Sequence, residues 1–464
     1  MEPLETYAPR RNGGAVMVIA MIVLLVISSL AVSIAAMSGT NVQLASNQHK
    51  TNRARACAES GFDIVRYWLS RVSVSGSSDS DERLYYIASS FLNELSSDNI
   101  RNITLSYDGS CLSIPEVVLD STTGECFSAE ITLPDIEHLQ VNVTGRSGLI
   151  TRTICAQYSF DINGHPIFNY GVATKGPLAL SGNIELDGIN VSVEASVFIE
   201  SESSTLALSI IGNSQIAGDV SVVNPSATVY LQGGQAGIGG ETGQDAIDNH
   251  VDFGVPEVSF PEPDASIFEQ YITTEIDCNT DTSIDATYEN VRIKANTNPS
   301  FSAQTTLNGI VFIETPNVVT FTGGAEITGI IVGDGDILDN SGDNRLIFTG
   351  NVESHHISDL PDEPQFDEIR NLDGTFIVAP GFSLSFGGSF STLSGVISGN
   401  GIDFSGNAGG VINGTIINYS GEEMTLSGNS DLYFNHSGVS EAPAGFVPQL
   451  VMTYNPSSYT EIIN

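Results

Sequence analysis

The chain has 464 residues, and only 15% of them are charged, so Ser, Thr, Asn and Gly must cover much of its surface. Asp and Glu outnumber Lys and Arg by 55 to 16, which gives a formal net charge of −39 at pH 7. The part after residue 171 holds five basic and 38 acidic residues, a net charge of −33. Coulomb repulsion therefore excludes binding to nucleic acid or anionic lipid through that part.

A long apolar segment follows the first residues. Residues 1–14 contain the basic pair Arg10 and Arg11, and residues 15–37 contain neither a charge nor a proline. At ~1.5 Å per helical residue this segment reaches about 34 Å, enough to cross a bilayer core of about 30 Å. The basic flank predicts a single-pass inner-membrane anchor with a cytoplasmic leader, residues 1–14, and the bulk of the chain in the periplasm or outside the cell.

The helical pattern continues beyond the membrane edge through residues 38–71. Small or apolar residues recur there at helical spacing, namely Cys57, Ala58, Gly61, Ile64, Val65 and Trp68. No proline lies between Pro9 and Pro115. We therefore expect one helix over residues 15–71, half of it membrane span and half of it a stalk that packs on the next domain.

This arrangement, with the sequence RRNGGAVMVIAMIVLLVISS and the segment ARACAESGFD, resembles the amino-terminal region of type IV pilus minor pilins of the PilX type and of tip pseudopilins of type II secretion. The resemblance implies that a prepilin peptidase cuts after Gly14, that Ala15 becomes the new N-terminus, and that the freed helix packs with other pilins in a filament. Ordinary pilins of this family carry glutamate at the fifth mature position, where this chain has Ile19. The difference favours a filament tip or a low-copy role.

Two other interpretations of the apolar segment are open. An uncleaved signal anchor has the same apolar length and basic flank, and a cleaved secretory peptide would end near the small residues Ala35 and Ala36. The run is longer than the apolar core of an ordinary signal peptide. The continuation of the helical pattern favours the pilin-like helix over both.

Residues 72–171 predict a small α+β body. Residues 83–95 have the pattern of a short amphipathic helix whose apolar side consists of Leu84, Ile87, Phe91 and Leu95. Alternating segments follow, and a Gly-containing turn near residue 148 predicts a hairpin within residues 139–160. A long helix on a small antiparallel sheet is the pilin body plan, which this pattern resembles.

The chain has five cysteines, and a location outside the cytoplasm permits disulfides. Cys111 and Cys126 flank a short turn-rich loop and are the predicted disulfide pair. Cys57 and Cys155 are either packed thiols or a bridge between helix and sheet, and Cys278 is solitary. Sequence alone does not determine the connectivity.

From residue 172 to residue 440, short β-branched runs alternate with Gly, Asn and Ser turns. Comparable corners recur about twenty residues apart, at Gly309 and Gly329 and again at Gly395 and Gly414. Such repeats bury an apolar strand face only by stacking on their neighbours, which predicts a parallel, right-handed β-helix. We expect its corners to hold Asn183, Asn213, Asn400, Asn407 and Asn429.

A β-sandwich is the competing architecture for these repeats, because its strands have a similar spacing. Sandwich hairpins need two-residue turns, whereas the repeated Ser/Thr-Gly-Asn/Gly triplets fit the corners of coils. The repeats also resemble the β-helical region found behind PilX-type helices in some bacterial pilus-related proteins. The predicted fold class is therefore mainly β: a long N-terminal helix, a small α+β body and then a solenoid.

Two stretches interrupt the repeat, and a tail follows it. Residues 233–280 lack clean alternation and contain three prolines, which predicts an insertion with a short helix near residues 265–272. Residues 358–370 form a second break. Both breaks are predicted to cap the coils or to pack on their side. Residues 441–464 are apolar enough to fold back as a C-terminal cap of the coils.

Chemical motifs are sparse. Asp334, Asp336, Asp339 and Asp343 form the densest acidic loop, and their oxygens could converge on calcium. The loop lacks the twelfth-position Glu of an EF-hand, which favours a solvated acidic turn. His355 and His356 are adjacent and would point to opposite faces of a strand, so a surface pair is favoured over a metal site. No phosphate-binding Gly-rich loop and no G-x-S-x-G motif is present.

These patterns predict a non-enzymatic minor pilin or pseudopilin that needs no cofactor and displays an acidic β-helix for adhesion. Its expected partners are the membrane, other pilins, a prepilin peptidase and a surface glycan or protein. The alternative is a membrane-anchored, extracellular, carbohydrate-active β-helix enzyme. Such an enzyme would gather several carboxylates and a base on one exposed strand face.

Overall fold

The computed structural model of the chain describes residues 13–75, 83–97, 103–201, 205–339, 342–438, 440 and 442–462. The chain divides into two compact units. The first, termed the body, comprises Met1–Val74, Ser78–Asp161 and Val451–Asn464, and the second, termed the coil unit, comprises Ser75–Ser77 and Ile162–Leu450. In the sequence, the coil unit is thus inserted between two parts of the body.

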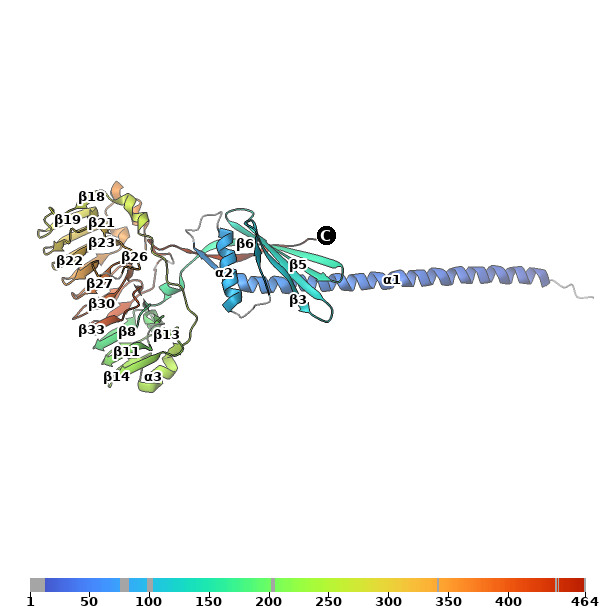
Figure 1. Ribbon diagram of the computed structural model, residues 1–464, viewed down its shortest axis with the longest axis horizontal. Helices are drawn as coiled ribbons and strands as arrows, with labels where there is room; N and C mark the ends of the chain where they lie inside the picture. Colours follow the sequence, from blue (N-terminus) through green and yellow to red (C-terminus); the bar gives the residue numbers. More distant parts are fainter. Residues whose placement is uncertain are drawn as a thin grey trace, which may run out of the picture. The chain divides into compact units, whose positions relative to one another are not determined.

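Helix α1 runs from Gly13 to Leu69 without a break, as the absence of proline predicts (Figure 1). Its side chains are exposed from Val16 to Lys50, and full burial begins at Ala54. The buried residues of the second half include most of the predicted stripe, and they are Ala54, Cys57, Ala58, Gly61, Phe62, Val65, Trp68 and Leu69. The division of the helix into an exposed half and a packed half is therefore confirmed.

A seven-stranded sheet packs on the second half of α1. Its order is β1-β35-β6-β5-β4-β3-β2, with bounds Ser73–Ser75, Gln449–Ile462, Ile150–Asn163, His138–Ser147, Glu125–Thr132, Cys111–Asp120 and Ser106–Tyr107. Strands β2 to β6 pair antiparallel, so the predicted hairpin of β5 and β6 is confirmed. Helix α2 (Arg83–Ser97) buries the four apolar residues predicted for its inner side.

Glycines bring the helix close to the sheet. A Cβ atom at Gly145 would lie 2.2 Å from the carbonyl oxygen of Ala54, and a Cβ atom at Gly61 would lie 2.4 Å from the ring of Phe127. Any larger residue would push the two layers apart, because real Cβ contacts are never so short. The stalk half of α1 is thus fitted to this particular sheet.

The prediction that residues 441–464 fold back on the coils holds for their first part, because Phe446 is buried with its ring centroid 5.4 Å from that of Phe168. The C-terminal strand corrects it for the rest. Strand β35 lies between β1 and β6 in the sheet of the body, so it does not cap the coils. Ser458 Oγ accepts the backbone N–H of Gln157 at 2.8 Å, Met452 is buried in the core, and Tyr454 packs on Phe62 with ring centroids 5.4 Å apart. The apolar tail was visible in the sequence, but its partner strand lies hundreds of residues earlier in the chain.

The coil unit contains three sheets that the chain visits in rotation. A first run of coils extends from β7 to β17. To sheet I it contributes β7 (Val172–Thr174), β10 (Val197–Ile199), β13 (Val220–Val222) and β17 (Val251–Phe253). To sheet II it contributes β8 (Leu178–Gly182), β11 (Leu206–Gly212) and β14 (Thr228–Gln232), and to sheet III β9 (Glu185–Gly188), β12 (Gln215–Ile216), β15 (Gly237–Ile238) and β16 (Glu241–Thr242). Helix α3 (Gly243–His250) precedes β17, and the 3-10 helices η1 (Pro166–Asn169) and η2 (Ser192–Ala195) precede β7 and β10.

The second run begins at residue 274. It contributes β18 (Thr274–Ile276), β19 (Ala286–Ile293), β21 (Thr305–Glu314), β23 (Ala325–Asp334), β25 (Val352–His355), β26 (Thr375–Ala379), β29 (Val396–Gly399) and β32 (Ile416–Asn418) to sheet I; β20 (Ser300–Phe301), β22 (Val318–Phe321), β24 (Arg345–Phe348), β27 (Ser383–Phe386), β30 (Ile402–Phe404) and β33 (Met424–Gly428) to sheet II; and β28 (Thr392–Leu393), β31 (Gly410–Ile412) and β34 (Leu432–Phe434) to sheet III.

Strand pairing between coils is parallel, which contradicts the β-sandwich alternative. Every strand pair described in the three sheets is parallel except β15 with β16, which form a small antiparallel turn at the end of the first run. The coil unit is therefore a large β domain with parallel sheets, in agreement with the predicted class.

The two runs are stacked in an order that the sequence does not show. Sheet I has the order β17-β13-β10-β7-β32-β29-β26-β23-β21-β19-β18, so the first strand of the coil unit, β7, lies in the interior of the sheet and pairs with β32. In Figure 1 the same junction is visible in sheet II, where β33, coloured as a late part of the chain, lies beside the green β8. The first coil, β7 to β9, is thus stacked directly on the last coil, β32 to β34.

Residues 233–280 are consequently not one insertion between coils. Their first part completes the first run through β15, β16, α3 and β17, and residues 254–273 then connect β17 at one end of sheet I to β18 at the other end. The predicted short helix is η3 (Ser266–Tyr271), whose Phe268 is fully buried. Prolines in this segment suit an extended connection, because they cannot donate hydrogen bonds to a ladder.

The interior of the coils is an apolar core in which side chains at equivalent positions of successive coils stack on one another. Five phenylalanines of sheet II form a column with ring centroids 4.8–5.0 Å apart and nearly parallel rings, and they are Phe301, Phe321, Phe348, Phe386 and Phe404. This distance equals the spacing of paired strands. The predicted glycine corners stack as well, since a Cβ atom at Gly329 would lie 1.9 Å from the carbonyl oxygen of Gly309.

The outer face of sheet I is also covered. Ile310, Phe312, Ile330 and Val332 point away from the interior of the coils and pack against the connection and the second break. Within the break, Ile357, Leu360, Phe366 and Ile369 are buried, and they lie in or near the 3-10 helices η4 (Ile357–Asp359), η5 (Pro364–Phe366) and η6 (Ile369–Asn371). The predicted side-packing of residues 358–370 is therefore confirmed.

Candidate functional site

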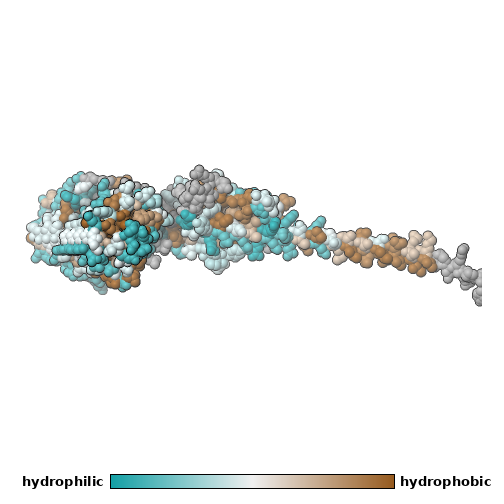
Figure 2. All heavy atoms as spheres, turned by 90° about the horizontal axis from the view of Figure 1, so that it is seen from below, coloured by the Kyte–Doolittle hydropathy of each residue, from teal (hydrophilic) through white to brown (hydrophobic). Residues whose placement is uncertain are grey.

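The exposed half of α1 is the first candidate for function. Among the described residues, one helix, Val16–Leu69, is long and apolar enough to cross a membrane, and its most apolar stretch is entirely unburied. Figure 2 shows this stretch as a continuous hydrophobic surface on the part of α1 that extends away from the sheet. Leu25 and Ile19 are 69% and 61% exposed. Water cannot be the medium for so much apolar surface, which must be covered by lipid or by other helices.

The predicted cleavage site lies at the start of this helix. Gly14 and Ala15 are in the first turn of α1, and the basic residues Arg10 and Arg11 lie outside the described residues. Ile19, one turn further along the helix, is 61% exposed.

The predicted Cys111–Cys126 disulfide is wrong in this structure. The register of β3 and β4 places Cys111 opposite Thr132 and Cys126 opposite Val118, so the two thiols are about 20 Å apart along the strands. Cβ atoms of a disulfide must lie within about 4.5 Å of each other. The turn between the strands is at residues 121–124, and Cys111 is at the far end of its strand.

All five cysteines are free thiols here. Cys57 is buried on the packed half of α1, and burial raises the pKa of its thiol. Burial also raises the pKa of Cys155. Cys126 accepts a hydrogen bond from Nε of Arg146 at 3.3 Å. The packed-thiol interpretation of Cys57 and Cys155 therefore holds in this structure, and their protonated state makes them poor nucleophiles.

The four aspartates of the predicted calcium loop are not gathered into a site. Asp336 Oδ1 accepts the backbone N–H of Leu338, and Asp339 Oδ2 accepts Nδ2 of Asn344, both at 2.9 Å. Asp334 ends strand β23, and Asp343 follows on the other side of the loop. In the described part of the chain, no three carboxylate, His or Cys side chains are grouped closely enough to hold a metal ion.

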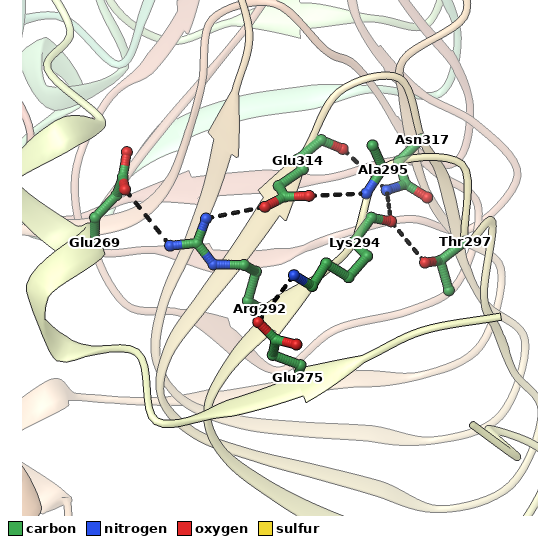
Figure 3. A network of polar contacts seen from close by, with 8 residues as sticks. All are labelled: Glu269, Glu275, Arg292, Lys294, Ala295, Thr297, Glu314 and Asn317. Atoms are coloured by element: carbon green, nitrogen blue, oxygen red, sulfur yellow. Dashed lines mark hydrogen bonds and ion pairs between the residues drawn. The ribbon is translucent and has the colours of Figure 1, made fainter. Parts of the chain in front are cut away.

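Asp334 lies instead within electrostatic reach of Glu269, Glu314 and Arg292. These three residues belong to a charged network on the outer face of sheet I (Figure 3). Arg292 contacts Oε1 of Glu314 at 2.9 Å and Oε2 of Glu269 at 3.5 Å, and Lys294 contacts Glu275 at 2.9 Å. Glu314 also accepts the backbone N–H of Ala295. Burial, followed by the charges of Glu269 and Glu314, raises the pKa of the Asp334 carboxyl. The network ties η3 to three neighbouring strands.

The two adjacent histidines separate as expected, and one of them has unexpected partners. His355 Nε2 lies 3.5 Å from Glu326, whereas His356 Nε2 lies 2.9 Å from Oδ1 of Asp373 and its Nδ1 lies 2.7 Å from Oγ of Ser358. A Ser-His-Asp triad contains the same three residue types, but there the Asp contacts Nδ1 and the Ser contacts Nε2, which is the reverse of the arrangement here. His356 is the N-cap of η4, and Ser358 lies in the same turn, so capping accounts for the arrangement. Ser358 does not line the adjacent hollow that His356 and Asp373 border.

A polar hollow of about 430 Å³ lies where the two runs of coils meet. It is lined by Asn183, Ile184, Glu185, Asn213, Gln215, Asn429 and Asp431. Asn183, Asn213, Asn407 and Asn429 occupy the corners predicted for them and form a ladder, whereas Asn400 lies at another corner and donates to the carbonyl oxygens of Ile337 and Asp339. Sequence reasoning predicted the corners but not the hollow, because the hollow exists only after the two runs are stacked.

Comparison with known proteins supports the pilin-like character of the N-terminus. The family model described as PilX N-terminal matches residues 13–63, which is most of helix α1. No curated protein matches the chain. Among solved structures, the crystal structure of the competence-associated pilin ComZ from Thermus thermophilus matches with 11% identity and a TM-score of 0.24, covering 89% of this chain and 98% of that chain. The family match agrees with the resemblance inferred from the sequence and is confined to the helix.

Proposed function

We propose that this protein is a minor pilin or pseudopilin of a type IV pilus or of a related secretion filament. Helix α1 would store the protein in the inner membrane and then dock it among the helices of other pilins. The coil unit, proposed to be a right-handed parallel β-helix, would be displayed outside the cell. Its role would be surface interaction or adhesion and not catalysis.

One observation carries this proposal: a single unbroken helix of 57 residues has an exposed apolar half and a half packed on a sheet. A plain anchor needs no such continuity, because a flexible linker would tether the body equally well. A filament subunit needs it, since the rigid stalk fixes the position of the core helix relative to the sheet of the body. The PilX N-terminal match over residues 13–63 supports the same assignment.

Ile19 supports a tip or low-copy position within such a filament. Its side chain is apolar at the position of the usual glutamate, and a core helix without that carboxylate differs from the helices that repeat along a filament. The resemblance to tip pseudopilins rests on the same residue.

Processing tests the proposal. When the chain is expressed with a prepilin peptidase, the mature protein should begin at Ala15, and Gly14→Val should leave the leader attached. N-terminal sequencing of envelope protein measures both. A chain that keeps Met1 in the presence of the peptidase, or that begins beyond Ala36, removes the pilin assignment. Saccharide cleavage that depends on Asp334 or Asp336 would instead support the carbohydrate-active enzyme.

A further inference from the structure

The hollow at the junction of the two runs has an unusual composition. Asn183, Glu185, Asn213 and Gln215 come from the first run, and Asn429 and Asp431 come from the second run. Amides and carboxylates make up all of its lining except Ile184, and no Lys, Arg or His is among the lining residues. A site of this kind attracts a ligand that is rich in hydrogen-bonding groups and carries no negative charge.

The amides form a regular row of donors and acceptors. Nδ2 of Asn213 donates to Oδ1 of Asn183 at 2.8 Å, and Nδ2 of Asn183 donates to Oδ1 of Asn429 at 3.0 Å. Each amide has two N–H donors and two lone pairs on its oxygen, and the ladder uses one of each at Asn183. A second donor and a second acceptor therefore remain for a ligand. The row repeats at the strand spacing of about 4.8 Å.

The carboxylates lie in line with the amides. Glu185 and Asp431 precede the paired residues Leu186 and Leu432, so they occupy equivalent positions on neighbouring strands. Oδ1 of Asp431 accepts the backbone N–H of Glu185 at 3.1 Å, and Oε2 of Glu185 accepts the hydroxyl of Tyr433 at 3.4 Å. Each carboxylate keeps further lone pairs, and hydrogen bonds to an ionised acceptor are the stronger kind.

The chemistry of the hollow favours a saccharide over a protein segment. Protein partners are held mainly by apolar or aromatic anchors in desolvated pockets, and this hollow has only the edge of Ile184 to offer. Hydroxyl groups both donate and accept, so they suit a row of amides flanked by carboxylates. A linear polymer can repeat its contacts along the row, which adds affinity without any single strong contact.

We propose that this hollow binds a neutral polysaccharide, with Glu185 and Asp431 accepting hydrogen bonds from its hydroxyl groups and the asparagine row donating to its oxygens. The inference extends the proposed display function by giving the coil unit a class of partner. Because the hollow needs side chains from both runs, binding requires the junction between β9 and β34 to be formed.

The test uses the full chain in detergent and a panel of soluble polymers. The neutral members are dextran, laminarin and cellohexaose, the anionic member is alginate, and the cationic member is oligolysine. Affinity electrophoresis or calorimetry should detect binding to at least one neutral glycan and none to alginate. The double variant Glu185→Gln, Asp431→Asn should weaken that binding at least tenfold, because it replaces both ionised acceptors while keeping an oxygen for each existing hydrogen bond.

Asp252→Asn is the matched control, since it removes one negative charge from exposed strand β17, outside the hollow. Its affinity should equal that of the unchanged chain. Thermal unfolding checks that all variants are folded, and Gln215→Ala, which should weaken binding at least threefold, provides a second variant if the double variant is unstable. Absence of binding to every neutral glycan, equal binding by the double variant and the control, or a preference for oligolysine would each overturn the proposal.

Processing at Gly14 is measured on the same proteins and separates this inference from the proposed function. Normal cleavage with no glycan binding refutes the proposed glycan site and leaves the pilin proposal intact. Glycan binding with no cleavage refutes the pilin proposal and leaves the proposed glycan site intact.

Discussion

The body and the coil unit build their cores in different ways. In the body, one long helix and one short helix cover a sheet whose strand β35 comes from the C-terminal end of the chain. In the coil unit, each strand adds to equivalent strands above and below it, and the same residue types recur in columns. The stability of the body should therefore depend on a few pairings between strands that are far apart in the sequence. In the coil unit, the effect of a substitution should depend on whether the residue is buried or exposed.

Both units share one property, which is that order in space differs from order in the chain. Strand β35 lies between β1 and β6, which come early in the chain. In the stack, the coils that come first in the sequence lie next to those that come last. Loop closure explains why this is tolerated, since its entropic cost grows only with the logarithm of loop length. Stacking of coils requires matched registers and not consecutive numbering.

Removal of β35 should have the largest effect. Deletion of residues 449–464 takes away a strand from the interior of the body sheet together with buried Met452, so the body should unfold while the coil unit keeps its structure. Limited proteolysis should then degrade residues of the body and spare residues 172–434. A matched chain with a short peptide added after Asn464 should be as resistant as the original. Intact protection of α2 in the deletion variant would contradict the role of β35.

A buried charge in a middle coil should have the next largest effect. Ile330 is 0% exposed and packs between sheet I and the second break, so Ile330→Asp should cost about 4 kcal/mol of unfolding free energy in the coil unit. Denaturant unfolding followed by circular dichroism measures the loss. Ile211→Asp is the control, because Ile211 is 39% exposed on β11 and should change stability by about 1 kcal/mol at most. Equal losses of unfolding free energy in the two variants would argue against the burial of both faces of sheet I.

A charge in the exposed half of α1 should act on the membrane and not on folding. Leu25→Arg places a cation near the centre of the span, at an expected insertion cost of about 2.5–3.5 kcal/mol. Fractionation should show less protein in the membrane, with unfolding of the coil unit unchanged. Val42→Arg, beyond residue 37 on the same helix, should insert normally. Equal membrane recovery of both variants would remove the assignment of residues 15–37 as the span.

The smallest effect should come from pH. His165 is 4% exposed, and burial lowers the pKa of its imidazole from 6.5 to about 4. The unfolded chain therefore binds this proton at a higher pH than the folded chain, so the coil unit should lose stability as pH falls from about 6.5 toward 4. The loss from this group should be about 2 kcal/mol at pH 5.

His165→Asn should remove that part of the pH dependence, because asparagine is neutral throughout and can still accept the N–H of Ile167. Unfolding free energies of both proteins at pH 7 and pH 5 give the comparison. The difference in unfolding free energy between the two proteins should narrow as pH falls. A constant difference would mean that the pKa of His165 is the same in the folded and the unfolded chain.

Local periodicity was sufficient for the elements whose partners are close in sequence. The stripe from Cys57 to Trp68, the inner side of α2 and the hairpin of β5 and β6 are each specified within a few turns or residues, and all were predicted. The glycine corners at Gly309 and Gly329 were visible because the repeat brings the same strained backbone position back after each coil.

The failed predictions concern which segments of the chain lie next to each other in space. The Cys111–Cys126 disulfide assumed that a short separation in sequence means proximity, but an extended strand carries the two residues apart. Strand β35 was assigned to the coils together with Phe446, which does pack there, because nothing in its own residues identifies β6 as its neighbour. Residues 233–280 read as an insertion because a connection along the stack has no periodicity of its own.

The sequence by itself determined the anchor, its pilin-like continuation, the small helix and the coil repeat, since each of these follows from the spacing of side chains along one element. Only the tertiary structure decided the order of the coils, the place of β35 and the meeting of Asn183 and Glu185 with Asn429 and Asp431. The physical reason is that parallel strands of similar composition can stack in several orders. The choice among these orders depends on how well the side chains of paired strands match in register. Here the paired strands are separated in the sequence by about two hundred residues or more.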